Sequence, residues 1–120
     1  MTAPTLDLTI DQGTSFEKLI QWKDAGKTPY DLTGCVALMQ VRTTADAQEI
    51  LLELSTENNR IKLSQGEGKL LLIFDAAATT PLTFESAVYD LLVKFPTGVI
   101  RRVVQGAFTL SQGVTKWPTP

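Results

Sequence analysis

The sequence holds few residues of the types that carry enzyme chemistry. It has no histidine among its 120 residues, so the commonest general base and the commonest metal ligand are both missing. Its one cysteine, Cys35, falls in an apolar, strand-like run, where we expect a buried and inert thiol. A Ser-His-Asp triad, a Cys-His pair and a His-based zinc site are therefore excluded.

Two glycine-containing segments resemble parts of phosphate-binding loops. Gly26-Lys27-Thr28 matches the end of such a loop, but Gln21 stands where the motif requires glycine, and Pro29 prevents a helix from following. The segment at residues 66–68 likewise leads into no predicted helix. We expect both segments to be turns.

The acidic residues, thirteen in all, are spread along the whole chain. None has the one-three-five spacing of a calcium-binding loop. Any fold can bring two carboxylates together for glycosidase chemistry, but a solvated sheet face explains these residues more simply. We therefore expect no catalytic residues, no metal site and no cofactor, and the protein is predicted not to be an enzyme.

Three residues stand out as candidates for partner contacts: Arg101, Arg102 and Trp117. Adjacent residues of a strand point to opposite faces, so the two arginines do not form a basic patch. Arg102 shares its parity with Val104 and Phe108, which predicts a charge beside the core on an edge strand, a device against aggregation. An ion pair across a subunit contact is the alternative. Trp117 lies in a proline-rich tail and either anchors in a partner's pocket or folds back over its own domain.

Length and composition bound the class of protein. A chain of 120 residues with 43% hydrophobic and 20% charged residues is typical of one globular domain. The formal charge of −2 offers no basic excess to attract nucleic acid or an anionic membrane. The chain has one cysteine, no signal-peptide pattern and no apolar run of the ~20 residues that a bilayer span requires. We expect a domain that folds in a reducing, aqueous compartment.

Apolar residues alternate with polar ones over short segments that are separated by turn residues, a pattern typical of a sandwich or barrel. We expect strands at residues 6–10, 15–22, 35–42, 49–54, 60–64, 69–74, 87–95 and 99–110. Residues 44–57 include good helix formers and could be helical instead. The alternation of Ile50, Leu52 and Leu54 favours the strand.

The sequence thus predicts an all-β fold, an immunoglobulin-like β-sandwich of about 7–9 antiparallel strands. One short helical turn is expected near residues 75–79, with Asp75 as its N-cap. Tyr89, two residues before the inward-facing Leu91, stands where such sandwiches often carry a tyrosine corner. Residues 1–120 make a single domain, and its ends, residues 1–4 and 114–120, are expected to be flexible.

Several stretches carry a resemblance to a known family. They are residues 11–16, 21–26, 30–34, 37–42, 53–58, 89–91 and 106–110. Over roughly residues 5–115, the sequence resembles small bacteriophage and prophage virion proteins that accompany tail, baseplate or fibre components. It is similar to the immunoglobulin-like N-terminal domain of some baseplate proteins, which anchors a receptor-binding element.

The resemblance implies a non-catalytic structural protein of a phage virion, present in several copies in a symmetric assembly with other virion proteins. Because no fibre stalk or receptor-binding domain follows Pro120, we expect an adaptor in the tail, baseplate or fibre attachment. It is expected in the virion, and in the host cytoplasm during assembly. A capsid decoration protein is the alternative. A carbohydrate-binding module is less favoured, because the aromatic residues fall mostly on core parity.

Overall fold

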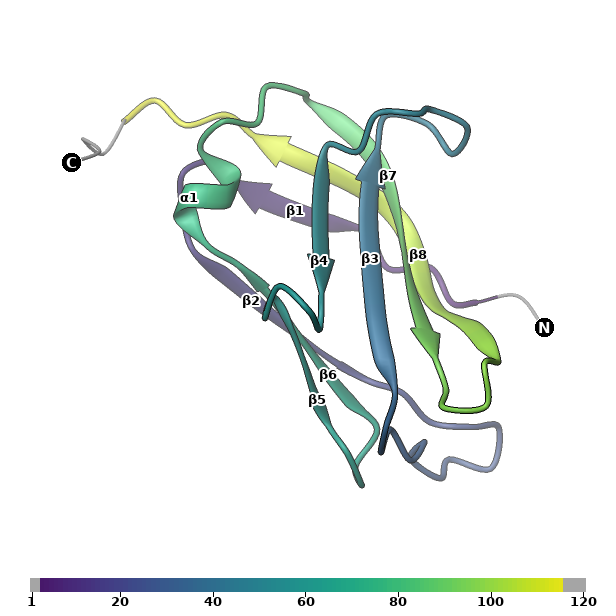
Figure 1. Ribbon diagram of the computed structural model, residues 1–120. Coiled ribbons are helices and arrows are strands. Elements are labelled where there is room, and N and C mark those ends of the chain that lie inside the picture. Colours follow the sequence, from purple (N-terminus) through teal and green to yellow (C-terminus); the bar gives the residue numbers. More distant parts are fainter. Residues whose placement is uncertain (1–2, 116–120) are drawn as a thin grey trace.

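Strands with one buried face account for most of the fold. The structure, a computed structural model, describes residues 3–115 (Figure 1). The elements are β1 (Leu8–Asp11), β2 (Phe16–Gln21), β3 (Val36–Arg42), β4 (Leu52–Ser55), β5 (Ile61–Ser64), β6 (Lys69–Phe74), α1 (Ala76–Thr79), β7 (Ser86–Lys94) and β8 (Ile100–Ser111). In most of them, buried and exposed residues alternate, as a strand with one apolar face requires.

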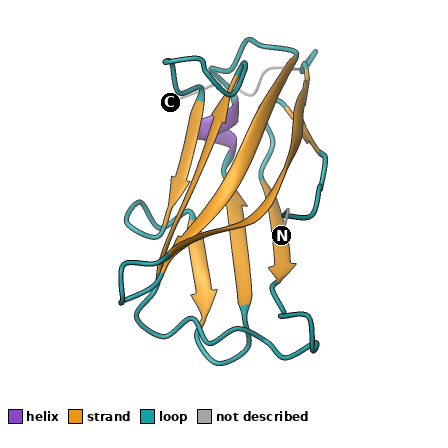
Figure 2. Cartoon of the chain, turned by 90° about the vertical axis from the view of Figure 1, so that its right-hand side faces the viewer, coloured by secondary structure: helices purple, strands orange, loops and turns teal. Residues whose placement is uncertain are grey.

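Two sheets pack face to face, with α1 near one end (Figure 2). The larger sheet has the strand order β1-β8-β7-β3-β4, and the smaller has the order β2-β6-β5. Met39 and Val41 project into the core from the first sheet, and Leu70, Leu72 and Phe74 project from the second. Burial of these alternating side chains drives the two layers together.

Most of the expected elements are confirmed. The described part of the chain has eight strands in two sheets and one short helix, as the all-β prediction requires. Asp75 is the N-cap of α1, and its carboxylate accepts a hydrogen bond of 2.7 Å from the Ala78 amide. The segment that could have been helical forms β4, although this strand begins at Leu52 and leaves Ile50 exposed outside it.

The prediction that all strands are antiparallel is wrong at β1. This strand runs parallel to β8, with Leu8 opposite Phe108 and Ile10 opposite Leu110. Hairpin neighbours must be antiparallel, but β1 and β8 lie at opposite ends of the chain, so no tight turn constrains their relative direction.

Because β8 contains a β-bulge, Arg102 lies on the opposite face of the sheet from the one expected. Leu91 lies opposite Val104 and Leu92 lies opposite Arg102, which leaves Val103 as the extra residue. The bulge allows two consecutive valines, Val103 and Val104, to be buried together. Arg102 consequently lies on the outer face of the sheet and not on the face of Val104, so the expectation of an inward charge is wrong.

The burial pattern of β7 predicts how two neighbouring leucines differ in their contribution to stability. Leu91 is fully buried, so the change Leu91→Ala is expected to lower the free energy of unfolding by about 2–5 kcal/mol. Leu92 is half-buried on the outer face, and Leu92→Ala should cost about 1 kcal/mol or less. Denaturant unfolding measures both values. Equal losses would contradict the assignment of faces in β7.

Candidate interaction surfaces

The outer face of the larger sheet carries apolar side chains that are exposed or, in the case of Leu92, half-buried. We call them the outer-face patch: Val36, Leu38, Leu92 and Ile100. Leu38 lies directly opposite Leu92 on neighbouring strands. Val36 and Ile100 are 47% and 58% exposed, which is high for side chains of this kind. Three strands thus contribute apolar groups to one area that faces solvent, in which Lys94 lies between Val36 and Ile100.

Charged and polar groups border the outer-face patch. The Arg102 guanidinium forms an ion pair of 3.1 Å with Asp90, and the Gln40 amide donates to the Glu53 carboxylate at 2.8 Å. Lys94 lies opposite both Val36 and Ile100. A hollow of about 360 Å³ is lined by the four patch residues, by Lys94, and by polar residues of β4 and of the turn after it. An apolar centre with a polar rim is the usual composition of a protein–protein contact.

The first half of β8 forms an open edge of the sheet. The amide of Gln105 donates to the Pro4 carbonyl, and that of Ala107 donates to the Asp7 carboxylate, so these outward-pointing groups are satisfied by the N-terminal segment. Backbone groups alternate in direction along a strand, and the bulge adds one residue to the count. The amides and carbonyls of Ile100 and Arg102 therefore also point outward from this edge. Among residues 3–115, no strand lies beside residues 100–103 on this side, and Pro4 lies beside Val104.

The position of the N-terminal segment depends on a contact between Tyr89, Gly106 and Leu6. Tyr89 lies opposite Gly106 on the neighbouring strand, and its hydroxyl donates a hydrogen bond to the Leu6 carbonyl. A Cβ atom at Gly106 would lie 2.2 Å from that carbonyl oxygen, so only glycine leaves room for the segment. The expected tyrosine corner is therefore not what the structure shows. Tyr89 bonds to the segment just before β1 and not to a nearby turn.

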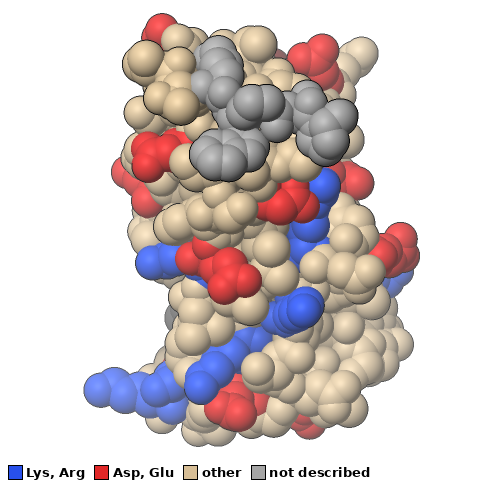
Figure 3. All heavy atoms as spheres, turned by 90° about the vertical axis from the view of Figure 1, so that its left-hand side faces the viewer, with Lys and Arg blue, Asp and Glu red and all other residues tan. Residues whose placement is uncertain are grey.

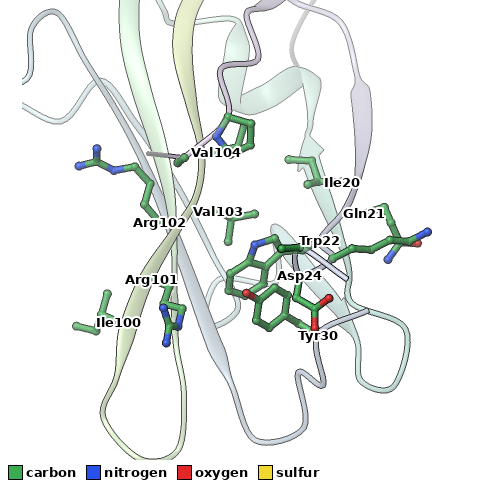
Figure 4. A pocket seen from close by; sticks show the side chains of 14 residues that line it. Ile20, Gln21, Trp22, Asp24, Tyr30, Ile100, Arg101, Arg102, Val103 and Val104 are labelled. Carbon is green, nitrogen blue, oxygen red and sulfur yellow. The ribbon is translucent and has the colours of Figure 1, made fainter. Parts of the chain in front are cut away.

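A groove runs between the open edge of β8 and strand β2, which is itself an edge strand of the smaller sheet. We call it the edge groove. It has a volume of about 700 Å³, and its lining includes Ile20, Trp22, Tyr30, Arg101 and Val103. Figure 4 shows Arg101 and Val103 on the side of β8 that faces the two aromatic rings. The groove therefore combines an apolar floor, charged side chains that include Arg101, and a strand edge with no partner among the described residues.

The aromatic floor of the edge groove is a stacked pair. The rings of Trp22 and Tyr30 lie 4.0 Å apart, close to parallel, and Phe95 packs against Trp22 from the core side at 5.9 Å. Both Trp22 and Tyr30 remain half-buried. Their rings are thus held in place by packing and still present area to the groove.

A tight turn and a glycine bring these two aromatic residues together. In the turn, the Thr28 amide donates to the Asp24 carboxylate at 3.0 Å, and the two segments that flank it join through a 3.1 Å bond from the Tyr30 amide to the Trp22 carbonyl. Gly68 has a φ of +64°, and a Cβ there would lie 2.5 Å from the Trp22 carbonyl oxygen. The expectation of turns at residues 26–28 and 66–68 is confirmed.

The structure separates the three residues that the sequence singled out. Arg101 faces the edge groove, where it has no ion pair or hydrogen bond to any described residue, whereas Arg102 borders the outer-face patch (Figure 4). Trp117 lies outside the described residues. Sequence reasoning missed Trp22 and Tyr30 as a pair, and it missed the patch, although the apolar residues Val36 and Leu38 on the outward parity of their strand were a usable signal.

The expectation that the Cys35 thiol is fully buried is wrong. It lies just before β3 and is only half-buried. Partial burial, and secondarily the charge of Asp31, raise the pKa of the Cys35 thiol. The pKa of Asp31 itself is lowered, because the hydroxyl and the amide of Thr33 both donate to its carboxylate. Less thiolate is present at a given pH than in an ordinary cysteine.

Neither the distribution of charge nor the comparison with other proteins identifies a ligand or a family. Acidic and basic side chains intermingle on the face toward α1 and β2 (Figure 3). Over residues 3–115, no three His, Cys, Asp or Glu side chains gather where they could hold a metal ion. In that same part of the chain, no helix combines the length and the apolar character that a bilayer crossing needs. No protein-family model matches the sequence, and no curated protein matches it.

The contact of Tyr89 with the N-terminal segment predicts a specific pH dependence. Burial, and secondarily the charge of Asp7, raise the pKa of Tyr89 to about 12. The neutral hydroxyl therefore stabilises the fold fully below pH ~10, the ordinary tyrosine value, and this contribution is lost as the pH rises to about 12.

The change Tyr89→Phe should lower the free energy of unfolding by about 1–2 kcal/mol at pH 8, because the Leu6 carbonyl loses its donor. The difference between the two proteins should shrink between pH 10 and 12. Denaturant unfolding across this range measures it, and titration of other groups cancels in the comparison. A difference that stays constant up to pH 12 would contradict the assigned role of the hydroxyl.

Proposed function

We propose that this chain is a non-catalytic structural protein of a phage virion, an adaptor in the tail, baseplate or fibre attachment that is present in several copies. The observation that carries the proposal is the outer-face patch. Exposed apolar areas that are bordered by polar groups are typical of contacts with other proteins. The sequence resemblance to small virion proteins supports the phage setting.

The strands beneath the outer-face patch suit a structural contact. β3 and β7 are interior strands of the larger sheet, so backbone hydrogen bonds hold Leu38 and Leu92 from both sides. A partner that docks here meets a surface whose backbone is already ordered. The conformational entropy lost on binding is correspondingly small, which favours a stable contact.

Several acidic residues near the two surfaces have structural partners, which supports a non-catalytic role. The carboxylate of Asp24 accepts from a turn amide, and that of Asp31 accepts from Thr33. Asp90 is paired with Arg102. These contacts explain why the carboxylates lie where they do without a reaction.

The proposal includes an immunoglobulin-like assignment of the sandwich, supported by the two packed sheets and by the resemblance. The parallel β1 and the bond from Tyr89 to the Leu6 carbonyl depart from the expected pattern. A capsid decoration protein would use the same patch on the head of the particle. Immunogold labelling of purified particles distinguishes the tail from the head.

The proposal is tested by the amount of the protein in gradient-purified particles from cells that produce the phage. We expect the unchanged chain at several copies per particle by quantitative mass spectrometry. The change Leu38→Asp puts a charge in the middle of the outer-face patch, next to Leu92, and should reduce this occupancy at least tenfold, because an unpaired charge buried in a contact is costly.

Leu19→Asp is the matched control. Leu19 is an exposed leucine of β2, in the other sheet, and its replacement should leave the occupancy unchanged. Thermal melting of both variants separates a lost contact from a lost fold. Absence of the unchanged protein from the particles would refute the proposed function, and full occupancy with Leu38→Asp would refute the role of the patch.

A further inference from the structure

The outer face of the larger sheet carries opposite charges on its two sides. Strands β8, β7, β3 and β4 lie side by side in this order (Figure 1). Lys94 and Arg102, on β7 and β8, form a basic flank. Glu53 on β4 and Glu57 in the turn after it form an acidic flank, and both are exposed. The apolar centre of the outer-face patch lies between the two flanks, so the face is complementary to a second copy of itself.

We infer that the outer-face patch binds the same patch of a second copy of this chain, in a dimer whose two-fold axis runs along the strands, between β3 and β7. The inference rests on the proposed function in one respect, the use of this patch as a protein contact, and it names the partner. All residues of the contact belong to the described part of the chain.

An axis along the strands matches apolar groups with apolar groups and opposite charges with each other. It places β7 of one copy over β3 of the other, so Leu92 meets Leu38 of the second copy, and the same contact occurs twice. β8 then lies over β4, and Arg102 faces the strand position between Glu53 and Glu57. The two sheets pack in the aligned arrangement that is usual for sheet faces.

An axis across the strands opposes like charges. It would bring Lys94 to Asp90 of the second copy, because these residues lie on either side of Leu92 in β7. It would also place Arg102 over its own equivalent and Glu53 over Glu57. The contacts between like charges outnumber the attractive ones in this arrangement, which disfavours it.

The free edge of β4 is closed to strand addition, which leaves the face as the contact on this side of the sheet. The side-chain oxygen of Asn58 accepts from the Ser55 amide at 2.9 Å, and its amide group donates to the Glu53 carbonyl at 3.1 Å. The Arg60 amide donates to the Ser55 carbonyl at 3.1 Å. The turn after β4 thus satisfies the groups through which another strand would pair.

The size of the face predicts a weak dimer. Four strands spaced ~4.8 Å apart, with about eight residues each at ~3.3 Å per residue, cover roughly 19 by 26 Å, or about 500 Å². A standard stable contact buries ~800 Å² on each partner. The isolated chain should therefore associate only at high concentration. Several copies held in one assembly would associate more completely, because their effective concentration is higher.

Charge reversal at Lys94 and Glu57 tests both the dimer and its axis. Neither side chain has an ion pair or a hydrogen bond to a described residue, so these changes leave the contacts within the domain intact. In the inferred dimer, Lys94 lies over Val36 and beside Glu57 of the second copy. Sedimentation velocity over a wide range of concentration measures association of the unchanged chain, Lys94→Glu, Glu57→Lys and the chain that carries both changes. Melting temperatures verify that all are folded.

We expect the unchanged chain to form a dimer. Each single reversal should weaken it at least about fivefold, because two symmetric attractions become repulsions, and the double change should restore most of the association. Leu38→Asp should weaken it at least about tenfold, and Leu19→Asp, in the other sheet, should leave it unchanged. A chain that stays monomeric would overturn the inference. So would a dimer that Glu57→Lys strengthens, which would place the axis across the strands, or one that Leu38→Asp leaves intact.

Comparison with the occupancy of particles separates this inference from the proposed function. If the purified chain is monomeric and Leu38→Asp still lowers the occupancy, the patch contacts another virion protein. The inference then fails and the proposed function stands. If the chain dimerises as expected and is absent from the particles, the proposed function fails and the inference stands.

Discussion

The N-terminal segment can lie against β8 only where Gly106 leaves room for it, and much of the architecture depends on that constraint. The Leu6 carbonyl occupies the space of a side chain at Gly106, and the Tyr89 hydroxyl donates to the same carbonyl. Asp7 then satisfies the Ala107 amide, and β1 continues along the rest of β8. Residues 4–11 thus cover the edge of the longest strand from about Gln105 onward, and nothing in the described part of the chain pairs with residues 100–103 there.

The open half of β8 also contains the bulge, and together these features give one strand two different surfaces. Because Val103 is an extra residue, Arg101 and Val103 face the edge groove while Ile100 and Arg102 lie on the outer face. The groove and the outer-face patch therefore lie back to back along residues 100–104. A subunit with two such surfaces can contact one neighbour through its sheet edge and another through its sheet face.

The local parts of this arrangement could be predicted from the sequence, and the long-range parts could not. Alternation of apolar residues identified the central strand β3 and the inward position of Leu91, and Asp75 is a local cap. The direction of β1 could not be found this way, because alternation is the same in parallel and antiparallel strands. The bulge could not be found either, because Val103 and Val104 are both apolar. A regular strand that buries only one of these two valines fits the sequence equally well.

Amide hydrogen exchange along β8, measured by NMR on the dilute monomer, tests the central claim most directly. If the N-terminal segment covers only the second half of this edge, the Ile100 and Arg102 amides should exchange rapidly, whereas those of Gln105 and Ala107 should be protected by Pro4 and Asp7. Protection of Arg102 equal to that of Ala107 would mean that the edge is already covered in the monomer. That result would contradict the open edge and the groove built on it.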